Sequence, residues 1–166
     1  MPTQTYRTIT GREISLLELS PAERQLLARV REKYETAPTW TGFASWWLEE
    51  FQRSGLPITS VAYRISDDLE ARLGIAEGRV AQPDYRDYLL DLIEEKHGSR
   101  YEFCKQTGVD PGQLSRVFAS KADLSLPHLS ELLAKLDATL AVESIRELEE
   151  RITPAGAAES LASVGR

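Results

Sequence analysis

The sequence predicts a mainly α-helical protein with two domains. Helix-start signals, in which Ser, Thr or Asp precedes Pro or Glu, recur along the 166 residues, and apolar residues at helical spacing follow them. Gly and Pro gather between residues 74 and 83, which separates the helices into two groups. The stretch from Ser99 to Phe118 then carries the start and stop signals of two short helices joined by a tight turn.

Residues 1–80 are expected to form a small helical N-terminal domain. Two short β-prone runs flank Thr10-Gly11 and fit either a small hairpin or an irregular arm. Ser20-Pro21-Ala22-Glu23 then opens a helix that ends before Pro38. A later helix is expected from about Ser60 to Leu73, with Gly74 as its stop.

The helix between these two carries the most aromatic patch of the chain. It is expected to begin at Thr39 or Thr41 and to end at Gly55, and it places Phe43, Trp46, Trp47 and Phe51 at helical spacing. A buried core is the favoured interpretation of this stripe. A dimer or partner surface is the alternative, because Trp and Tyr dominate interface hot spots.

The segment 74–83 is expected to be a linker or an ordered loop, and the domain boundary is placed there. The next domain is expected to span residues 83–143, beginning with a helix from Pro83 or Asp84 to Gly98. Ser125 caps a later apolar helix, and residues 138–142 are β-prone and able to pair as a short strand with a second chain. Residues 144–166 are expected to be a partly disordered tail in which RELEERI adds a helical turn or two.

Two helix caps define the stretch from Ser99 to Phe118. Ser99 and Glu102 have the spacing of a capping box, and Gly108 is placed to end that helix. Asp110 opens the second helix, with Pro111 at its first position. The apolar residues placed to pack between the two helices are Phe103, Val109, Leu114 and Val117.

This stretch resembles the helix–turn–helix of the lambda-repressor/Cro-like (XRE) DNA-binding family. Ser99 and Arg100 open the second helix of the motif, Cys104 takes its small buried position and Gly108-Val109 makes the turn. Leu114, Ser115 and Val117 continue the pattern. The resemblance extends from about Asp84 to about Val142 and implies a five-helix DNA-binding domain.

The resemblance also implies a DNA-reading helix from Pro111 to Ala119 that enters the major groove. Pro111 and Gly112 depart from the Gln or Ser common in the family and offer a bare, positively polarised helix end. Base readout is then expected from Arg100, Gln113 and above all Arg116, whose alternative role is a solvated surface charge. The residues suited to phosphate contacts are Ser99, Ser115, Ser120, Lys121 and Ser125.

Charge and motif content limit the other functions. The formal net charge is −6, but residues 97–128 carry a net +1, and the local field decides phosphate binding. His97, His128 and Cys104 do not have the spacing of metal ligands, and no nucleophile-elbow, zinc-protease or phosphate-loop motif is present. Neither an enzyme nor a cofactor is therefore expected. The single cysteine, the absence of an apolar run of about 20 residues and the lack of a secretory signal predict a cytoplasmic protein without a membrane span.

Three functional hypotheses follow. The first is a sequence-specific transcriptional regulator that binds double-stranded DNA as a homodimer. The second is an antitoxin-type regulator that also binds a protein partner through the exposed part of the Phe43–Phe51 stripe. The third is a helix–turn–helix kept for protein interaction alone. A continuous positive strip around Arg100, Arg116 and Lys121 favours DNA, whereas interruption by Glu102, Asp110 or Asp123 favours the interaction module.

Overall fold

The computed structural model describes residues 4–162, apart from the side chains at 159 and 160, and it is mainly helical. The chain divides into two compact units. Unit 1 combines the chain up to Gln82 with the segment from Ser144 onward, and unit 2 is Pro83–Glu143. The first crossing between the units lies inside the predicted linker, but the second makes unit 1 discontinuous.

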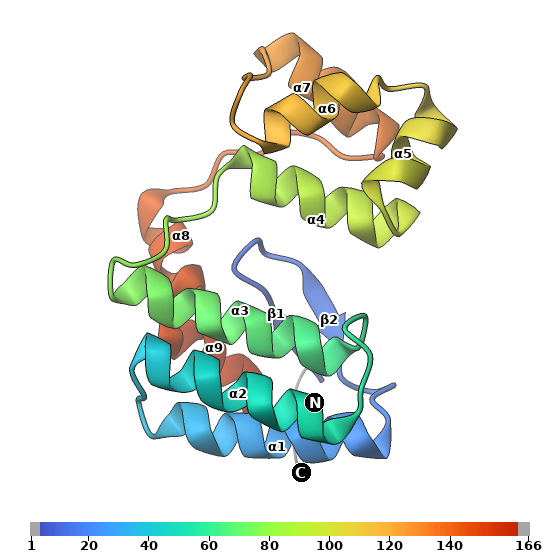
Figure 1. Ribbon diagram of the computed structural model, residues 1–166. Helices are drawn as coiled ribbons and strands as arrows, with labels where there is room; N and C mark the ends of the chain where they lie inside the picture. Colours follow the sequence, from blue (N-terminus) through green and yellow to red (C-terminus); the bar gives the residue numbers. More distant parts are fainter. Residues whose placement is uncertain (1–3, 163–166) are drawn as a thin grey trace. The chain divides into compact units, whose positions relative to one another are not determined.

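Three helices in mutual contact form the body of unit 1 (Figure 1). They are α1 (Pro21–Glu35), α2 (Trp40–Ser54) and α3 (Val61–Ala76), capped by Ser20, Thr39 and Ser60. The aromatic stripe of α2 faces inward, since Phe43, Trp47 and Phe51 are all buried in the core. Trp46 is only partly buried and packs against this core.

The N-terminal arm is a hairpin, the first of its two predicted alternatives. Strands β1 (Thr5–Arg7) and β2 (Glu13–Ser15) pair antiparallel, with Tyr6 opposite Ile14. Both of these side chains are buried while their strand neighbours are not, as expected for a ribbon with one covered face.

In the C-terminal tail the helical turns predicted for RELEERI are confirmed, whereas the predicted disorder is wrong for residues 154–161. Helices α8 (Ile145–Ile152) and α9 (Pro154–Leu161) follow unit 2 along the chain, and α9 contacts α1, α3 and β1. Ile152, Ala157 and Leu161 are buried. The small side chains of α9, which gave the segment its weak apolar signal, allow it to lie close to its neighbours. Residues 163–166 lie outside the described residues.

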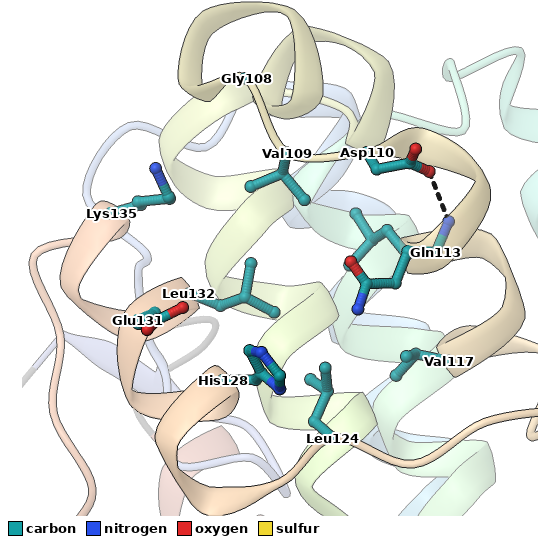
Figure 2. Close-up of a pocket in the computed structure, with 11 residues that line it drawn as sticks. Gly108, Val109, Asp110, Gln113, Val117, Leu124, His128, Glu131, Leu132 and Lys135 are labelled. Carbon is teal, nitrogen blue, oxygen red and sulfur yellow. Dashed lines mark hydrogen bonds between the residues drawn. The ribbon is translucent and has the colours of Figure 1, made fainter.

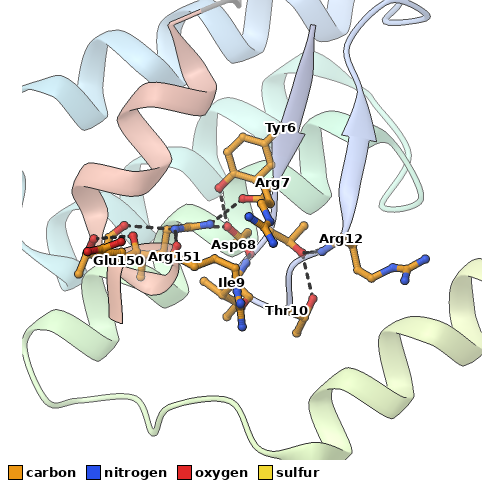
Figure 3. A network of polar contacts seen from close by, with 11 residues as sticks. Tyr6, Arg7, Ile9, Thr10, Arg12, Asp68, Glu150 and Arg151 are labelled. Atoms are coloured by element: carbon orange, nitrogen blue, oxygen red, sulfur yellow. Dashed lines mark hydrogen bonds and ion pairs between the residues drawn. The ribbon is translucent and has the colours of Figure 1, made fainter. Parts of the chain in front are cut away.

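A buried carboxylate on α3 fixes the hairpin. One oxygen of Asp68 accepts the Tyr6 hydroxyl proton at 2.5 Å, and the other accepts the Ile9 amide at 2.8 Å (Figure 3). Burial and the adjacent Asp68 charge raise the pKa of Tyr6 well above its usual value, so the phenol stays a neutral donor. The hairpin is therefore attached to α3 through polar groups that are shielded from water.

Arg72, one helical turn after Asp68, ties the C-terminal segment to the same point. Its fully buried guanidinium pairs with Asp68 at 2.8 Å and donates to the Arg7 carbonyl at 2.7 Å. It also donates to the backbone carbonyl of Arg151 and, at 3.2 Å, to that of Thr153. One side chain thus joins the hairpin, α3 and the connection between α8 and α9.

Gly74 is not the stop of α3, as its sequence position predicted, but a close-packing site inside that helix. A Cβ atom there would lie 2.4 Å from Cγ2 of Val80. The Val80 and Arg79 amides both donate to the Gly74 carbonyl, so the chain after α3 folds back over this residue. The predicted linker therefore begins as the last turn of α3, and its fold-back at Arg79 and Val80 needs glycine at position 74 because a side chain there would meet Val80.

Unit 2 contains four helices, one fewer than the resemblance implies, and all of its residues are described. They are α4 (Tyr85–His97), α5 (Arg100–Thr107), α6 (Pro111–Phe118) and α7 (Leu126–Lys135). Leu89, Ile93, Phe103 and Leu114 lie in their common core. Residues 138–142, which were expected to be able to pair as a strand with a second chain, form no strand in this structure. Leu140 and Val142 in this segment are exposed.

None of the described helices combines the length and the apolarity needed to cross a membrane.

Replacement of Arg72 by Met is expected to lower the free energy of unfolding by about 3–5 kcal/mol, because Asp68 and three carbonyls lose their buried partner. Urea denaturation followed by circular dichroism measures this change. Arg146→Met is the control, because Arg146 forms an exposed pair with Glu150 and its loss is expected to cost below about 1 kcal/mol. Equal losses for the two variants would contradict the central role given to Arg72.

Candidate nucleic-acid interface

Three residues connect α5 to α6, as the sequence predicts. Gly108 ends α5 in the left-handed conformation at φ 74°, and its amide donates to the Cys104 carbonyl. The Ser99 hydroxyl caps the start of α5 by accepting the Glu102 amide at 3.2 Å. Only this half of the predicted capping box is present. The other half, a bond from the Ser99 amide to the Glu102 carboxylate, is not among the described contacts, and that carboxylate accepts instead from the Gln106 side chain.

The start of α6 is not the bare helix end that Pro111 and Gly112 predicted. The Asp110 carboxylate accepts the Gln113 amide at 2.7 Å and so occupies this end with a negative charge. An aspartate here stabilises the helix because it faces the positive end of the helix dipole. It also opposes the approach of another anion, so the N-terminus of α6 is a poor phosphate site.

The exposed side of α6 has small side chains around one arginine. Gly112, Ser115, Arg116 and Ala119 follow the i, i+3, i+4, i+7 pattern of a single helix face, and all four are exposed. We call these four residues the outer face of α6. Among the described residues, no hydrogen bond or ion pair reaches the Arg116 guanidinium. Arg116 is therefore available to a ligand, with no bulky neighbour on its face.

Gln113 lies on another side of α6 and lines a groove beside α7. Figure 2 shows its side chain between Asp110, His128 and Leu124. The groove has a volume of about 210 Å³ and an apolar floor of Val109, Leu114, Val117, Leu124 and Leu132. Gln113 is thus placed with the groove residues and not on the outer face of α6.

Arg100 is also drawn away from the outer face. Its guanidinium carbon lies 5.5 Å from the centre of the Phe118 ring, in a cation–π contact. Both residues line a hollow of about 360 Å³ together with the carboxylates of Asp84, Asp87 and Glu94. Arg86 also lines this hollow and pairs with Asp84, which leaves Asp87 and Glu94 to offset the attraction of Arg100 for phosphate.

The predicted phosphate-contacting residues are either helix caps, Ser99 and Ser125, or exposed side chains that cap no helix, Ser115, Ser120 and Lys121. Ser99 and Ser125 cap α5 and α7, and the Ser125 hydroxyl also bonds to Nδ1 of His128 at 2.9 Å. Ser115 and Lys121 are exposed, and no ion pair to Lys121 occurs among the described residues. Ser120 is exposed at a left-handed φ of 56° in the turn after α6.

Arg86 and Tyr85, at the start of α4, hold the turn after α6, and sequence reasoning missed both. Arg86 donates to the Val117 carbonyl at 2.9 Å and pairs with Asp123, while the Tyr85 hydroxyl accepts the Leu124 amide at 3.2 Å. Partial desolvation lowers the pKa of Arg86, but its contacts with Asp84 and Asp123 outweigh this and raise it overall. These contacts join residues more than 30 positions apart, so no local pattern signals them.

Each acidic residue that was expected to interrupt a positive strip has a partner. Glu102 lies 3.9 Å from Lys105, Asp123 pairs with Arg86, and Asp110 caps α6. Unit 2 nevertheless has seven Lys or Arg residues against eleven Asp or Glu, a net charge of −4. The positive region is therefore small and centred on Arg116 and Lys121.

Other chemistry finds little support in unit 2. Cys104 is buried, and burial together with the Asp110 charge raises the pKa of its thiol, which makes it a weak nucleophile. No group of three His, Cys, Asp or Glu residues among the described ones is arranged to hold a metal ion.

Comparisons with family models, with curated proteins and with solved structures found no match to this chain.

Substitution of Asp110 tests its role as a cap. Asp110→Ala is expected to lower the stability of unit 2 by about 1 kcal/mol, because the Gln113 amide loses its acceptor. Asp110→Asn is the matched control, because an amide oxygen accepts the same bond and stability is expected to change little. Thermal unfolding measures both, and equal destabilisation by the two variants would show that the charge, not the cap, matters.

Proposed function

We propose that the chain is a DNA-binding transcriptional regulator that inserts the outer face of α6 into the major groove. In this proposal α5 and α6 form a helix–turn–helix, with α6 as the recognition helix. The contacts between α5 and α6 and the three-residue connection between them support it.

The observation that carries the proposal is the unpartnered guanidinium of Arg116 on a face of small residues. Gly112 and Ala119 lie one turn before Arg116 and just under one turn after it, so apart from Arg116 itself the outer face of α6 carries nothing longer than the Ser115 side chain. An arginine in the major groove binds guanine through O6 and N7, with about 1–3 kcal/mol of discrimination against other bases. Arg116 is accordingly assigned the main base contact.

Lys121 and Ser115 are assigned to phosphates in this proposal. Both are exposed, and Lys121 lies in the turn after α6, where its charge adds to that of Arg116. Gln113 and Arg100 receive smaller roles than the resemblance implies, because Gln113 lines the groove beside α7 and Arg100 lies among carboxylates. The expected binding is therefore of limited sequence discrimination.

A homodimer completes the proposal. Two copies would place their recognition helices in successive major grooves, on inverted half-sites roughly 34 Å apart. The protein would act in the cytoplasm on double-stranded DNA, without a catalytic step, a metal or a cofactor.

A protein-interaction module without DNA binding is the second candidate. The net charge of −4 on unit 2 and the carboxylate at the start of α6 favour it. The antitoxin-type alternative gains no support from the Phe43–Phe51 stripe, because Phe43, Trp47 and Phe51 are core residues and the apolar surface there is confined to Leu48 and to parts of Ala44 and Trp46.

Selection from a random duplex pool followed by titration tests the proposal. The wild-type chain is expected to enrich guanine-containing half-sites, and Arg116→Ala is expected to weaken binding to them by about 1–3 kcal/mol with loss of the guanine preference. Lys121→Ala is expected to weaken binding to all duplex sequences about equally, because phosphates carry no sequence information.

Lys105→Ala is the matched control for Arg116→Ala. It removes the same charge from a residue that lies beside Glu102 on α5, so its effect on affinity is expected to be much smaller. A wild-type chain that enriches no sequence and binds no duplex at low salt would favour the interaction module. Equal effects of the Lys105 and Arg116 variants would show that only net charge matters.

A further inference from the structure

Arg86 is the most fully engaged cation of unit 2 among the described residues. Its side chain is 17% exposed, and it reaches three separate acceptors. Nε donates to the Val117 carbonyl at 2.9 Å, Nη1 pairs with Asp84 at 2.5 Å and Nη2 pairs with Asp123. The guanidinium also lies 4.7 Å from the centre of the Tyr85 ring, which limits its orientation.

The contact with Val117 acts on the end of α6. The last four carbonyls of a helix lack partners within the helix, and the dipole makes this end negative. A guanidinium is therefore well suited to the carbonyl of Val117, the residue that directly follows Arg116. The Ser120 amide also donates to the Val117 carbonyl, so Arg86 adds a second, side-chain donor at the last turn of α6, from which the Arg116 side chain extends.

The contact with Asp123 neutralises a negative charge close to Lys121 in the sequence. Asp123 lies two residues after Lys121 in the same turn, and its side chain is 80% exposed. Without a partner, this carboxylate would oppose phosphates that Lys121 attracts, at a separation too short for salt to screen fully. The Tyr85 hydroxyl donates to the same carboxylate at 3.2 Å and keeps it beside Arg86.

We propose that Arg86 is a positioning residue for DNA binding, which holds the last turn of α6 and neutralises Asp123 beside Lys121. The inference rests on the proposed function, because it assigns Arg86 a role only if the outer face of α6 contacts DNA. Arg86 itself is turned toward protein acceptors and needs no direct contact with DNA.

A double-mutant cycle tests this role. Arg86→Gln is expected to weaken binding of the selected duplex about fivefold at 0.15 M salt, the effect of one lost phosphate charge. Asp123→Asn alone is not expected to weaken binding. The double variant, Arg86→Gln with Asp123→Asn, is expected to bind more tightly than Arg86→Gln and more weakly than the wild type, because it removes the Asp123 charge but does not restore the Val117 contact. A purely structural role of Arg86 would give no such partial recovery.

Arg146→Gln is the matched control, because it breaks an exposed arginine–carboxylate pair on α8 and is expected to leave DNA affinity unchanged. Circular dichroism on each variant checks that the total helix content is retained, and the amide chemical shifts of α6 check that this helix is folded. Unchanged affinity in Arg86→Gln, or a double variant as weak as Arg86→Gln, would overturn the inference. If the wild-type chain binds no duplex, or if Arg116→Ala leaves affinity unchanged, the proposed function itself fails, and this result is obtained before any Arg86 variant is made.

Discussion

The ion pair between Asp68 and Arg72 is the contact on which unit 1 depends. Both residues lie on α3, one turn apart, and through them the hairpin and the connection between α8 and α9 reach the same buried point. A buried pair of charges adds stability only when its remaining hydrogen-bonding atoms are also satisfied. Here both Asp68 oxygens accept, and each nitrogen of the Arg72 guanidinium donates.

This network explains why unit 1 needs both ends of the chain. The carbonyls of Arg151 and Thr153 are acceptors for Arg72, and Leu161 adds an apolar contact to the same core. The chain therefore leaves unit 1 at Gln82 and must return at Ser144 to complete it. Arg86 does similar work in unit 2, since it also combines carboxylate partners with a backbone carbonyl at a helix end.

Local signals made most of the helices predictable, and distant contacts explain what was missed. Ser20, Asp110 and Ser125 cap the helices they were expected to cap, because a cap depends only on the next three residues, and of the two candidates for α2 it is Thr39 that caps. The helical turns of RELEERI were predictable, but the order of α9 was hidden because it depends on contacts with β1, α1 and α3, far earlier in the chain. Gly74 was misjudged for the same reason, since the side chain that requires its lack of a Cβ belongs to the fold-back at Val80.

In the candidate interface, too, local features could be predicted from the sequence and those set by distant contacts could not. The i, i+3, i+4, i+7 spacing of Gly112, Ser115, Arg116 and Ala119 is readable from the sequence and identifies a face around Arg116. The places of Gln113 and Arg100 were not readable, because the groove beside α7 and the carboxylates of α4 determine them. Because the positive region of unit 2 is small and the rest of the unit is acidic, the proposed interface contains few contacts to DNA, and they are concentrated around Arg116 and Lys121.

Amide chemical shifts recorded during titration with a selected duplex test the central claim most directly. If α6 enters the major groove, the largest changes are expected at Gly112, Ser115, Arg116 and Ala119, with further changes at Lys121. Changes confined to the groove residues Val109, His128 and Leu132, or to unit 1, would contradict the claim that the outer face of α6 binds DNA.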